Sequence, residues 1–233
     1  MRISRMNLPP LNTHGRMLLC GLVLGICLVP HADRGTEFVR PMGAGVVVTM
    51  GGIEAWKVAG RIWGATILLL GWVSIALVSF TSLGATPSGH VVPGLMLATA
   101  YILSAVAIVR AAFGRRMHGP ERIYYGISSY LLIGIAFASV HQRIAIIDPG
   151  SYHAGGSDVV VDRWVDFLWL SFSTLTTAGF GDVVPVSNAA RMVSTLEAVT
   201  GVMYPAIFLA RLVGAATEDD EHDAAPHEPR SGR

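Results

Sequence analysis

The chain has 233 residues, of which 52% are hydrophobic and 14% are charged, and its formal net charge is +1 at pH 7. Its mean hydropathy of +0.52 is typical of an integral membrane protein. A nearly neutral chain offers no strongly basic surface, so we expect a lipid bilayer as its surroundings and no nucleic acid as its partner.

The N-terminal region holds two short apolar runs, 17–30 and 41–56. At about 14 and 16 residues, both are shorter than the ~20 residues of a usual membrane-spanning helix. They span a bilayer if their tilt is small and flanking arginines reach the interface. Basic residues before the first run (Arg2, Arg5 and Arg16) also fit a secretory signal peptide, although Pro30 and His31 make a poor cleavage site.

Four longer apolar runs predict membrane-spanning helices at 63–84, 91–113, 123–141 and 192–216. Arg115, Arg116 and Arg122 indicate that the loop before the third of these runs is cytoplasmic. If all six runs span, the protein is a multi-pass protein of the cell membrane with both termini in the cytoplasm. The run before that loop carries one basic residue, Arg110, so we expect no strong voltage gating.

A polar stretch at 144–163 follows the third long run and predicts an outer loop. The next segment, WVDFLWLSFSTL at 164–175, is long enough to enter a membrane as a helix of roughly 18 Å, but too short to cross it. Glycines then disfavour helix, and irregular backbone at membrane depth is tolerated only where protein buries it or where it lines a water-filled path. The pattern predicts a re-entrant helix followed by a returning loop.

The returning loop carries the motif TLTTAGFGDVVP at 174–185. Gly179 and Gly181 stand at alternate positions and permit left-handed backbone angles that cost other residues about 1–2 kcal/mol each. Successive carbonyl groups can then point to one side and replace the water shell of a cation, with the Thr177 hydroxyl as a further ligand. Ala178 and Phe180 are expected to point away from the ion and to pack against the re-entrant helix, whose negative C-terminal end favours a cation.

The sequence TTAGFGD resembles the signature of potassium channels, and the similarity to bacterial members of that family extends over 125–214. The resemblance implies a tetrameric pore of four identical chains with potassium bound along residues 177–181, the filter segment. The expected ion-binding residues are Thr177, Ala178, Gly179, Phe180 and Gly181, and the expected supporting residues are Trp169, Ser173, Thr174, Thr176, Asp182 and Glu197. Two positions depart from the family pattern: Ala178 replaces Val or Ile, and Phe180 replaces Tyr.

The last apolar run contains three features of interest. Glu197 is expected to brace the re-entrant helix through Ser173 or Thr174, or else to be a carboxyl group that is merely tolerated. Gly201 and Pro205 form either a bend that opens an inner gate or a static packing feature. In the same register, Val202 and Leu209 are expected to line the central cavity together with Pro205.

These observations divide the chain into N-terminal spans (1–116), a pore domain (117–216) and an acidic, disordered cytoplasmic tail (217–233). The expected fold is an all-α integral membrane helical bundle with a re-entrant pore helix and a selectivity-filter loop. The leading hypothesis is a potassium-selective channel that needs no cofactor beyond the transported ion. A weakly selective cation channel and a non-conducting membrane scaffold are the alternatives. We find no pair of nucleophile and base in the sequence that would indicate an enzyme.

Overall fold

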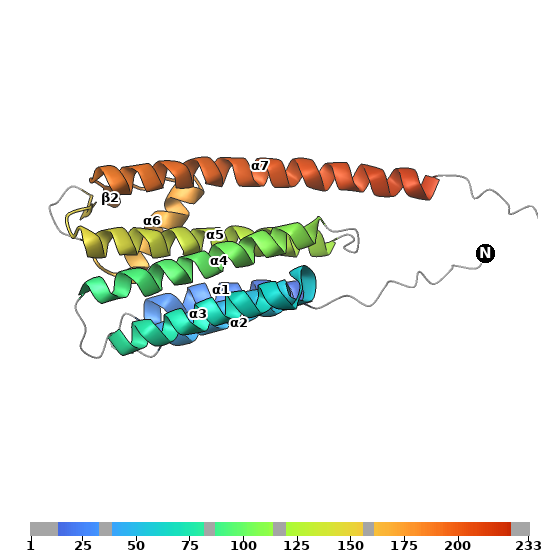
Figure 1. The fold of residues 1–233 in the computed structure, drawn as a ribbon. Coiled ribbons are helices and arrows are strands. Elements are labelled where there is room, and N and C mark those ends of the chain that lie inside the picture. The colour runs from blue at the N-terminus through green and yellow to red at the C-terminus, as the bar shows by residue number, and fades with distance from the viewer. Residues whose placement is uncertain (1–13, 33–38, 82–86, 114–119, 156–160, 225–233) are drawn as a thin grey trace, which may run out of the picture.

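The computed structural model describes residues 14–32, 39–81, 87–113, 120–155 and 161–224. The helices are α1 (His14–Ala32), α2 (Val39–Ala59), α3 (Arg61–Thr81), α4 (Val91–Ala112), α5 (Pro120–Ile147), α6 (Trp164–Leu175) and α7 (Asn188–Ala224), with a short 3-10 helix η1 (Pro87–His90). Two short antiparallel strands, β1 (Tyr152–Ala154) and β2 (Val183–Pro185), pair at one end of the molecule. The predicted all-α fold is confirmed (Figure 1).

Four helices of the described chain are long and apolar enough to cross a membrane, over Arg61–Ser79, Val91–Ala112, Glu121–Ile147 and Asn188–Gly214. They coincide with the four long apolar runs, so the prediction of a multi-pass membrane protein is confirmed. α1 and α2 are helices as well, and the apolar part of α1, Gly15–Cys27, is shorter than a usual span. α5 continues six residues beyond the predicted end at His141, which places residues 144–147 on a helix rather than in the outer loop.

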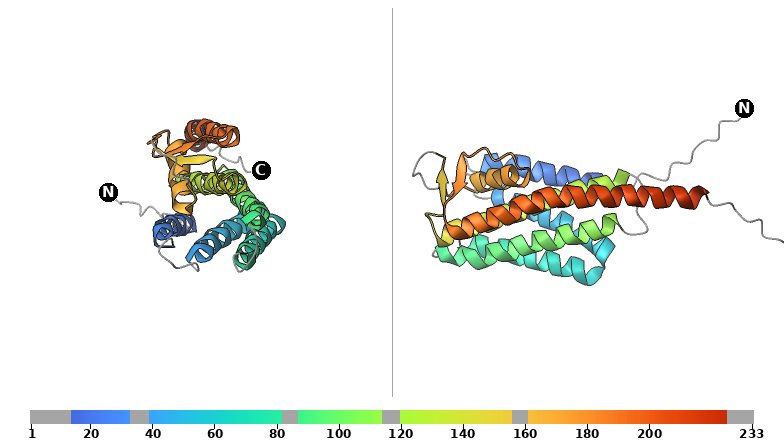
Figure 2. Two further views of the ribbon diagram at one scale, coloured as in Figure 1. Left: turned by 90° about the vertical axis from the view of Figure 1, so that its left-hand side faces the viewer. Right: turned by 90° about the horizontal axis from the view of Figure 1, so that it is seen from above.

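α5 is the central helix of the bundle and packs against α1, α4, α6 and α7. The end-on view in Figure 2 shows α7 on one side of α5 and the helices α1 to α4 in an arc on the other. Glycines of α5 allow close approach: a Cβ on Gly126 would lie 2.1 Å from the Phe208 ring, and one on Gly134 would lie 2.8 Å from the Phe172 ring. Lipid tails are as apolar as the side chains, so close packing of this kind is what holds membrane helices together.

Polar contacts join the N-terminal helices to α5. The Tyr125 hydroxyl donates a hydrogen bond of 2.8 Å to Glu54 on α2, and the other carboxylate oxygen of Glu54 lies 3.0 Å from the Lys57 ammonium. At the other end of α5, Arg143 donates to the His90 carbonyl just before α4 begins. α1 and α4 therefore pack directly on α5, α2 reaches it through Glu54, and α3 packs on α2 and α4.

α7 is the longest helix and continues to Ala224, beyond the apolar span that ends at Gly214. The prediction of a disordered tail from residue 217 is therefore wrong for residues 217–224, and 225–233 lie outside the described residues. No Gly or Pro occurs between Gly214 and Pro226. A helix that has already formed propagates easily through such a stretch, because the unfavourable nucleation step is complete.

Candidate ion-conduction site

α6 is a half-length helix that starts and ends as the sequence predicts, at Trp164 and Leu175. One face of α6 is buried against α5 and α7, and its residues are Phe167, Leu168, Leu170, Ser171, Ser173 and Leu175. The chain leaves the helix through a tight turn in which the Thr177 amide donates to the Thr174 carbonyl at 2.9 Å. The Tyr130 hydroxyl on α5 donates to the Leu175 carbonyl at 3.0 Å and so holds the end of α6 in place.

The filter segment, residues 177–181, has an alternating backbone. Thr177, Gly179 and Gly181 adopt left-handed φ values of 59°, 56° and 76°. The two glycines adopt this conformation at little cost, whereas a β-branched threonine in it is uncommon and strained. The sequence predicted left-handed angles at the two glycines. Thr177, two residues before Gly179, continues the same alternation.

Contacts behind the filter segment are few within one chain. The Gly179 amide donates to the Ser173 carbonyl at 3.1 Å, and the Phe180 ring stacks on the Trp169 ring of α6 with centroids 5.0 Å apart. Phe180 is nevertheless 64% exposed, and residues 176–182 are all exposed to solvent in the single chain. One chain therefore supplies an open strip of irregular backbone, which is costly in a membrane unless other protein covers it or water reaches it.

The strands β1 and β2 hold the chain as it leaves the filter segment. Tyr152 is paired with Pro185, and Ala154 with Val183. The Gly155 amide donates to the Asp182 carbonyl at 2.7 Å, and a Cβ on Gly155 would lie 2.1 Å from the Gly181 carbonyl oxygen. The outer loop thus packs directly against the end of the filter segment, which only a glycine at 155 permits.

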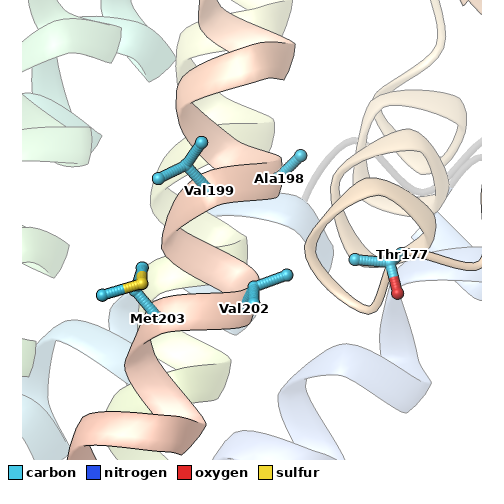
Figure 3. Close-up of a pocket in the computed structure, with 5 residues that line it drawn as sticks. All are labelled: Thr177, Ala198, Val199, Val202 and Met203. Atoms are coloured by element: carbon cyan, nitrogen blue, oxygen red, sulfur yellow. The ribbon is translucent and has the colours of Figure 1, made fainter.

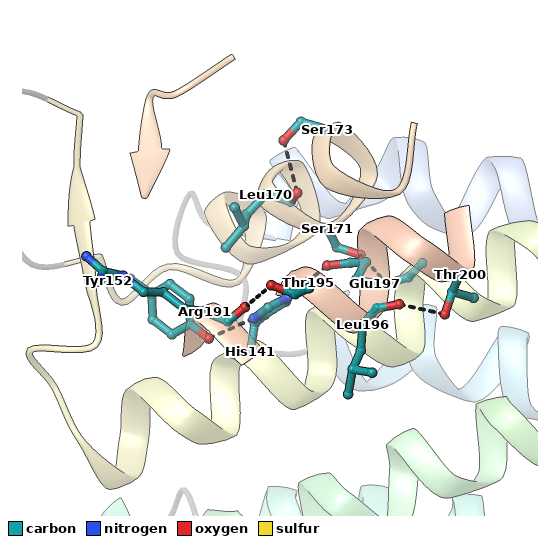
Figure 4. Close-up of polar contacts among 11 residues, drawn as sticks. His141, Tyr152, Leu170, Ser171, Ser173, Arg191, Thr195, Leu196, Glu197 and Thr200 are labelled. Atoms are coloured by element: carbon teal, nitrogen blue, oxygen red, sulfur yellow. Dashed lines mark hydrogen bonds and ion pairs between the residues drawn. The ribbon is translucent and has the colours of Figure 1, made fainter. Parts of the chain in front are cut away.

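Glu197 bonds to a different serine from the one the sequence suggested. Its carboxyl group contacts the Ser171 hydroxyl on α6 and lies 2.8 Å from His141 Nε2 on α5 (Figure 4). The prediction that Glu197 bonds Ser173 or Thr174 is wrong. The Ser173 hydroxyl donates to the Leu170 carbonyl of its own helix at 3.0 Å.

The reason for this correction is the register between α6 and α7. Ser171 and Leu175 lie four residues apart on one face of α6, and Glu197 and Gly201 lie four residues apart on the facing side of α7. Glu197 contacts Ser171, and a Cβ on Gly201 would lie 1.9 Å from the Leu175 carbonyl oxygen. Gly201 is therefore a position of close helix packing. α7 stays helical through both Gly201 and Pro205.

A hollow of about 390 Å³ opens beside the Thr177 end of the filter segment. It is lined by Thr177 together with Ala198, Val199, Val202 and Met203 of α7 (Figure 3). Val202, Pro205 and Leu209 are exposed, with Val202 and Leu209 at 55% and 60%. Of the residues expected to line a cavity, Val202 borders this hollow, and Leu209 and Pro205 lie further along α7.

The sequence did not predict three residues of this site: His141, Tyr152 and Ser171. His141 stands at the last position of the predicted 123–141 span, so its place inside a longer helix was not evident. The Tyr152 hydroxyl lies 2.7 Å from His141 Nδ1, although the two residues belong to a helix and to the outer loop. The four-residue spacing of Ser171 and Leu175 was the one available signal, because it places Ser171 on the face that ends at the filter segment.

A family model described as "Ion channel" matches residues 127–218. The calcium-gated potassium channel TvoK of Thermoplasma volcanium is 51% identical over 42 residues, which are 18% of this chain and 12% of that protein. Protein LctB of Bacillus caldotenax is 26% identical over 96 residues, which are 40% of this chain and 71% of that protein. No solved structure matches the chain.

The matched region runs from α5 through α6 and the filter segment to α7, so it contains every element that builds the site described above. Residues 127–218 therefore match the model of an ion-channel domain, and the chain spans 12% of the length of TvoK.

Proposed function

We propose that the protein is a potassium-selective channel in which four copies of the chain form one central pore. The observation that carries this proposal is the left-handed backbone at Thr177, Gly179 and Gly181. When every second residue is left-handed, successive carbonyl groups can face the same side of the chain. Backbone carbonyls arranged in this way replace the hydration shell of an ion, as in the filters of potassium channels.

Each part of the site has a role in this proposal. The carbonyl groups of Thr177, Ala178, Gly179 and Phe180, with the Thr177 hydroxyl at the inner end, bind dehydrated potassium ions in turn. α6 supports the filter segment from behind through Trp169 and the Ser173 carbonyl. The C-terminal end of α6 directs its partial negative charge towards the pore and stabilises a cation there. The chain therefore transports an ion and catalyses no reaction.

A fourfold assembly follows from what one chain leaves exposed. The filter segment is open on one side, and 11% of the span of α7 is buried. The exposed apolar side chains of α7 include Met192, Leu196, Val199, Val202, Met203, Ile207, Leu209 and Val213. Copies related by a closed rotational symmetry would cover part of this surface and would close four filter segments around one axis.

The purified protein is expected to be a tetramer in mild detergent, because fewer filter segments cannot enclose an ion. Native mass spectrometry measures this directly and should give a mass of about four chains. A preparation that contains monomers alone, and yet conducts, would contradict the proposed pore.

The distribution of basic residues supports an orientation with both termini in the cytoplasm and the β1–β2 pair outside. In this orientation α6 enters the membrane from the outer side. The helices α1 to α4, within 1–116, form a module that packs on α5 of the pore domain, within 117–216. Residues of α7 beyond Gly214 then extend into the cytoplasm.

A flux assay tests conduction. Liposomes that contain the protein and a high internal potassium concentration are expected to release potassium when a proton ionophore provides the counter-current. Protein-free liposomes and liposomes with a filter variant serve as controls. Equal release from all three preparations would contradict a channel.

A further inference from the structure

Tyr152, His141, Glu197 and Ser171 form a continuous buried cluster, here called the Glu197 network, that joins four separate elements of the pore domain. The residues come from β1, α5, α7 and α6 respectively, and each of them is 0% exposed. Figure 4 shows the side chains directed towards one another between α6 and α7. Three of them can gain or lose a proton, so the positions of their hydrogens decide how the network is held together.

The contacts of the network occur in a defined sequence. The Tyr152 hydroxyl lies 2.7 Å from His141 Nδ1, and His141 Nε2 lies 2.8 Å from Glu197 Oε2. Glu197 Oε1 contacts the Ser171 hydroxyl, whose oxygen also lies 2.7 Å from the Gly134 carbonyl oxygen. There are thus four contacts, and each requires one hydrogen.

Ser171 restricts the ways in which these hydrogens can be placed. A hydroxyl group has a single hydrogen to donate, whereas the Gly134 carbonyl is an acceptor and nothing else. If Glu197 were ionised, Ser171 would face two acceptors with one hydrogen, and one contact would be an oxygen pair without a bond. If Glu197 carries a hydrogen on Oε1, it donates to Ser171, and Ser171 donates to Gly134.

His141 completes the arrangement in its neutral form. Burial raises the pKa of the Tyr152 hydroxyl, which therefore keeps its proton and donates it to Nδ1. Nδ1 is then an acceptor, and Nε2 carries the ring hydrogen and donates it to Glu197 Oε2. A doubly protonated ring would instead direct a hydrogen at Tyr152 and leave the network with an unpaired hydroxyl hydrogen.

We infer that Glu197 is a protonated carboxylic acid, and that the Glu197 network is an uncharged chain of four hydrogen bonds, from Tyr152 to the Gly134 carbonyl, that positions the filter segment. The inference rests on the proposed channel function. Among the described residues, Tyr130 of α5 is a further titratable group close to Glu197, and it donates outside the network to the Leu175 carbonyl.

The network reaches the filter segment from both sides. Ser171 lies on α6, one turn before the helix ends, and Tyr152 is paired with Pro185, just after the filter segment. α5 and α7 connect these two points through His141 and Glu197. A displacement of either α6 or the β1–β2 pair would break a hydrogen bond of the network, so His141, Glu197 and Tyr152 act as positioning residues for selectivity.

Infrared spectroscopy of the whole protein tests the proton directly. The spectrum of the wild-type protein minus that of Glu197→Gln is expected to contain the C=O stretching band of a protonated carboxylic acid at neutral pH. In Ser171→Ala this band should move to the higher frequency of a more weakly bonded acid. If the difference spectrum shows carboxylate bands and no acid band, Glu197 is ionised and the inference is wrong.

Variants test the positioning role. Glu197→Gln keeps a donor for Ser171 and an acceptor for His141, so its permeability ratio of potassium to sodium should stay within about twofold of wild type. Glu197→Ala should lower that ratio roughly tenfold, which corresponds to ~1.4 kcal/mol. Equal losses in both variants would show that the negative charge is required, which would overturn the inference.

Two buried serines of the pore domain provide a matched control. Ser171→Ala removes a member of the network, whereas Ser139→Ala removes a buried hydroxyl of α5 that bonds within its own helix. Ser171→Ala should reduce selectivity and Ser139→Ala should not, and equal effects would contradict the inference. A wild-type protein that shows the acid band but no conduction would refute the proposed function and leave the protonation of Glu197 standing.

Discussion

Gly181→Ala is expected to abolish potassium flux and to leave the protein folded and tetrameric. Gly181 has a φ of 76°, and a Cβ added there would meet no atom within 4 Å. The effect is therefore conformational, since a left-handed alanine costs roughly 1–2 kcal/mol in each chain and in all four at once. The carbonyl group of residue 181 would then rotate out of line with the other carbonyl groups of the filter segment. Flux from liposomes measures the loss, and size-exclusion chromatography checks the assembly.

Gly214→Ala is the matched control for this change. A Cβ on Gly214 would also meet no atom within 4 Å, and its φ is not in the left-handed region. The same methyl group should therefore leave flux unchanged or slightly stabilise α7, because alanine favours helix by about 1 kcal/mol over glycine. Normal potassium flux in Gly181→Ala would mean that residues 177–181 are not the filter.

Gly201→Ala is expected to destabilise the assembled protein rather than to change its gating alone. A Cβ at this position would lie 1.9 Å from the Leu175 carbonyl oxygen and 2.6 Å from its carbon. α7 would have to move away from the end of α6, and overpacking of this kind costs typically ~1–3 kcal/mol. Thermal unfolding of the tetramer measures the cost, and Gly214→Ala on the same helix again provides the control.

This variant also separates the two interpretations of Gly201. A hinge that serves gating alone predicts a normal unfolding temperature together with a reduced open probability. The packing contact predicts a lower unfolding temperature, with altered conduction as a consequence of the displaced α6. An unfolding temperature equal to that of Gly214→Ala would contradict the packing role.

The part of the fold that could be predicted followed from the lengths of the apolar runs and from the spacing of the glycines. Long apolar runs located α3, α4, α5 and α7, and the shortness of the run at 164–175 located α6 with its correct ends. The alternation of glycines in the filter segment predicted left-handed angles at Gly179 and Gly181. These features depend on the chain itself, because bilayer thickness and backbone sterics act on each segment regardless of its neighbours.

The less predictable part depends on how helices meet. The choice of Ser171 over Ser173 follows from the rotation of α6 against α7, which the spacing of Ser171 and Leu175 on α6 does not determine by itself. His141 and Tyr152 meet because α5 extends to Ile147 and the outer loop folds back onto it. The helical start of the acidic tail was missed for another reason, since composition alone does not show that a preceding helix will propagate into it.

The reversal potential of the wild-type protein in a planar bilayer tests potassium selectivity most directly. With potassium chloride on one side and an equal concentration of sodium chloride on the other, the reversal potential is set by the logarithm of the permeability ratio of potassium to sodium. We expect a reversal potential far from zero that corresponds to a ratio of at least roughly tenfold, or ~1.4 kcal/mol. A reversal potential near zero would contradict a potassium-selective filter and would identify a weakly selective cation pore.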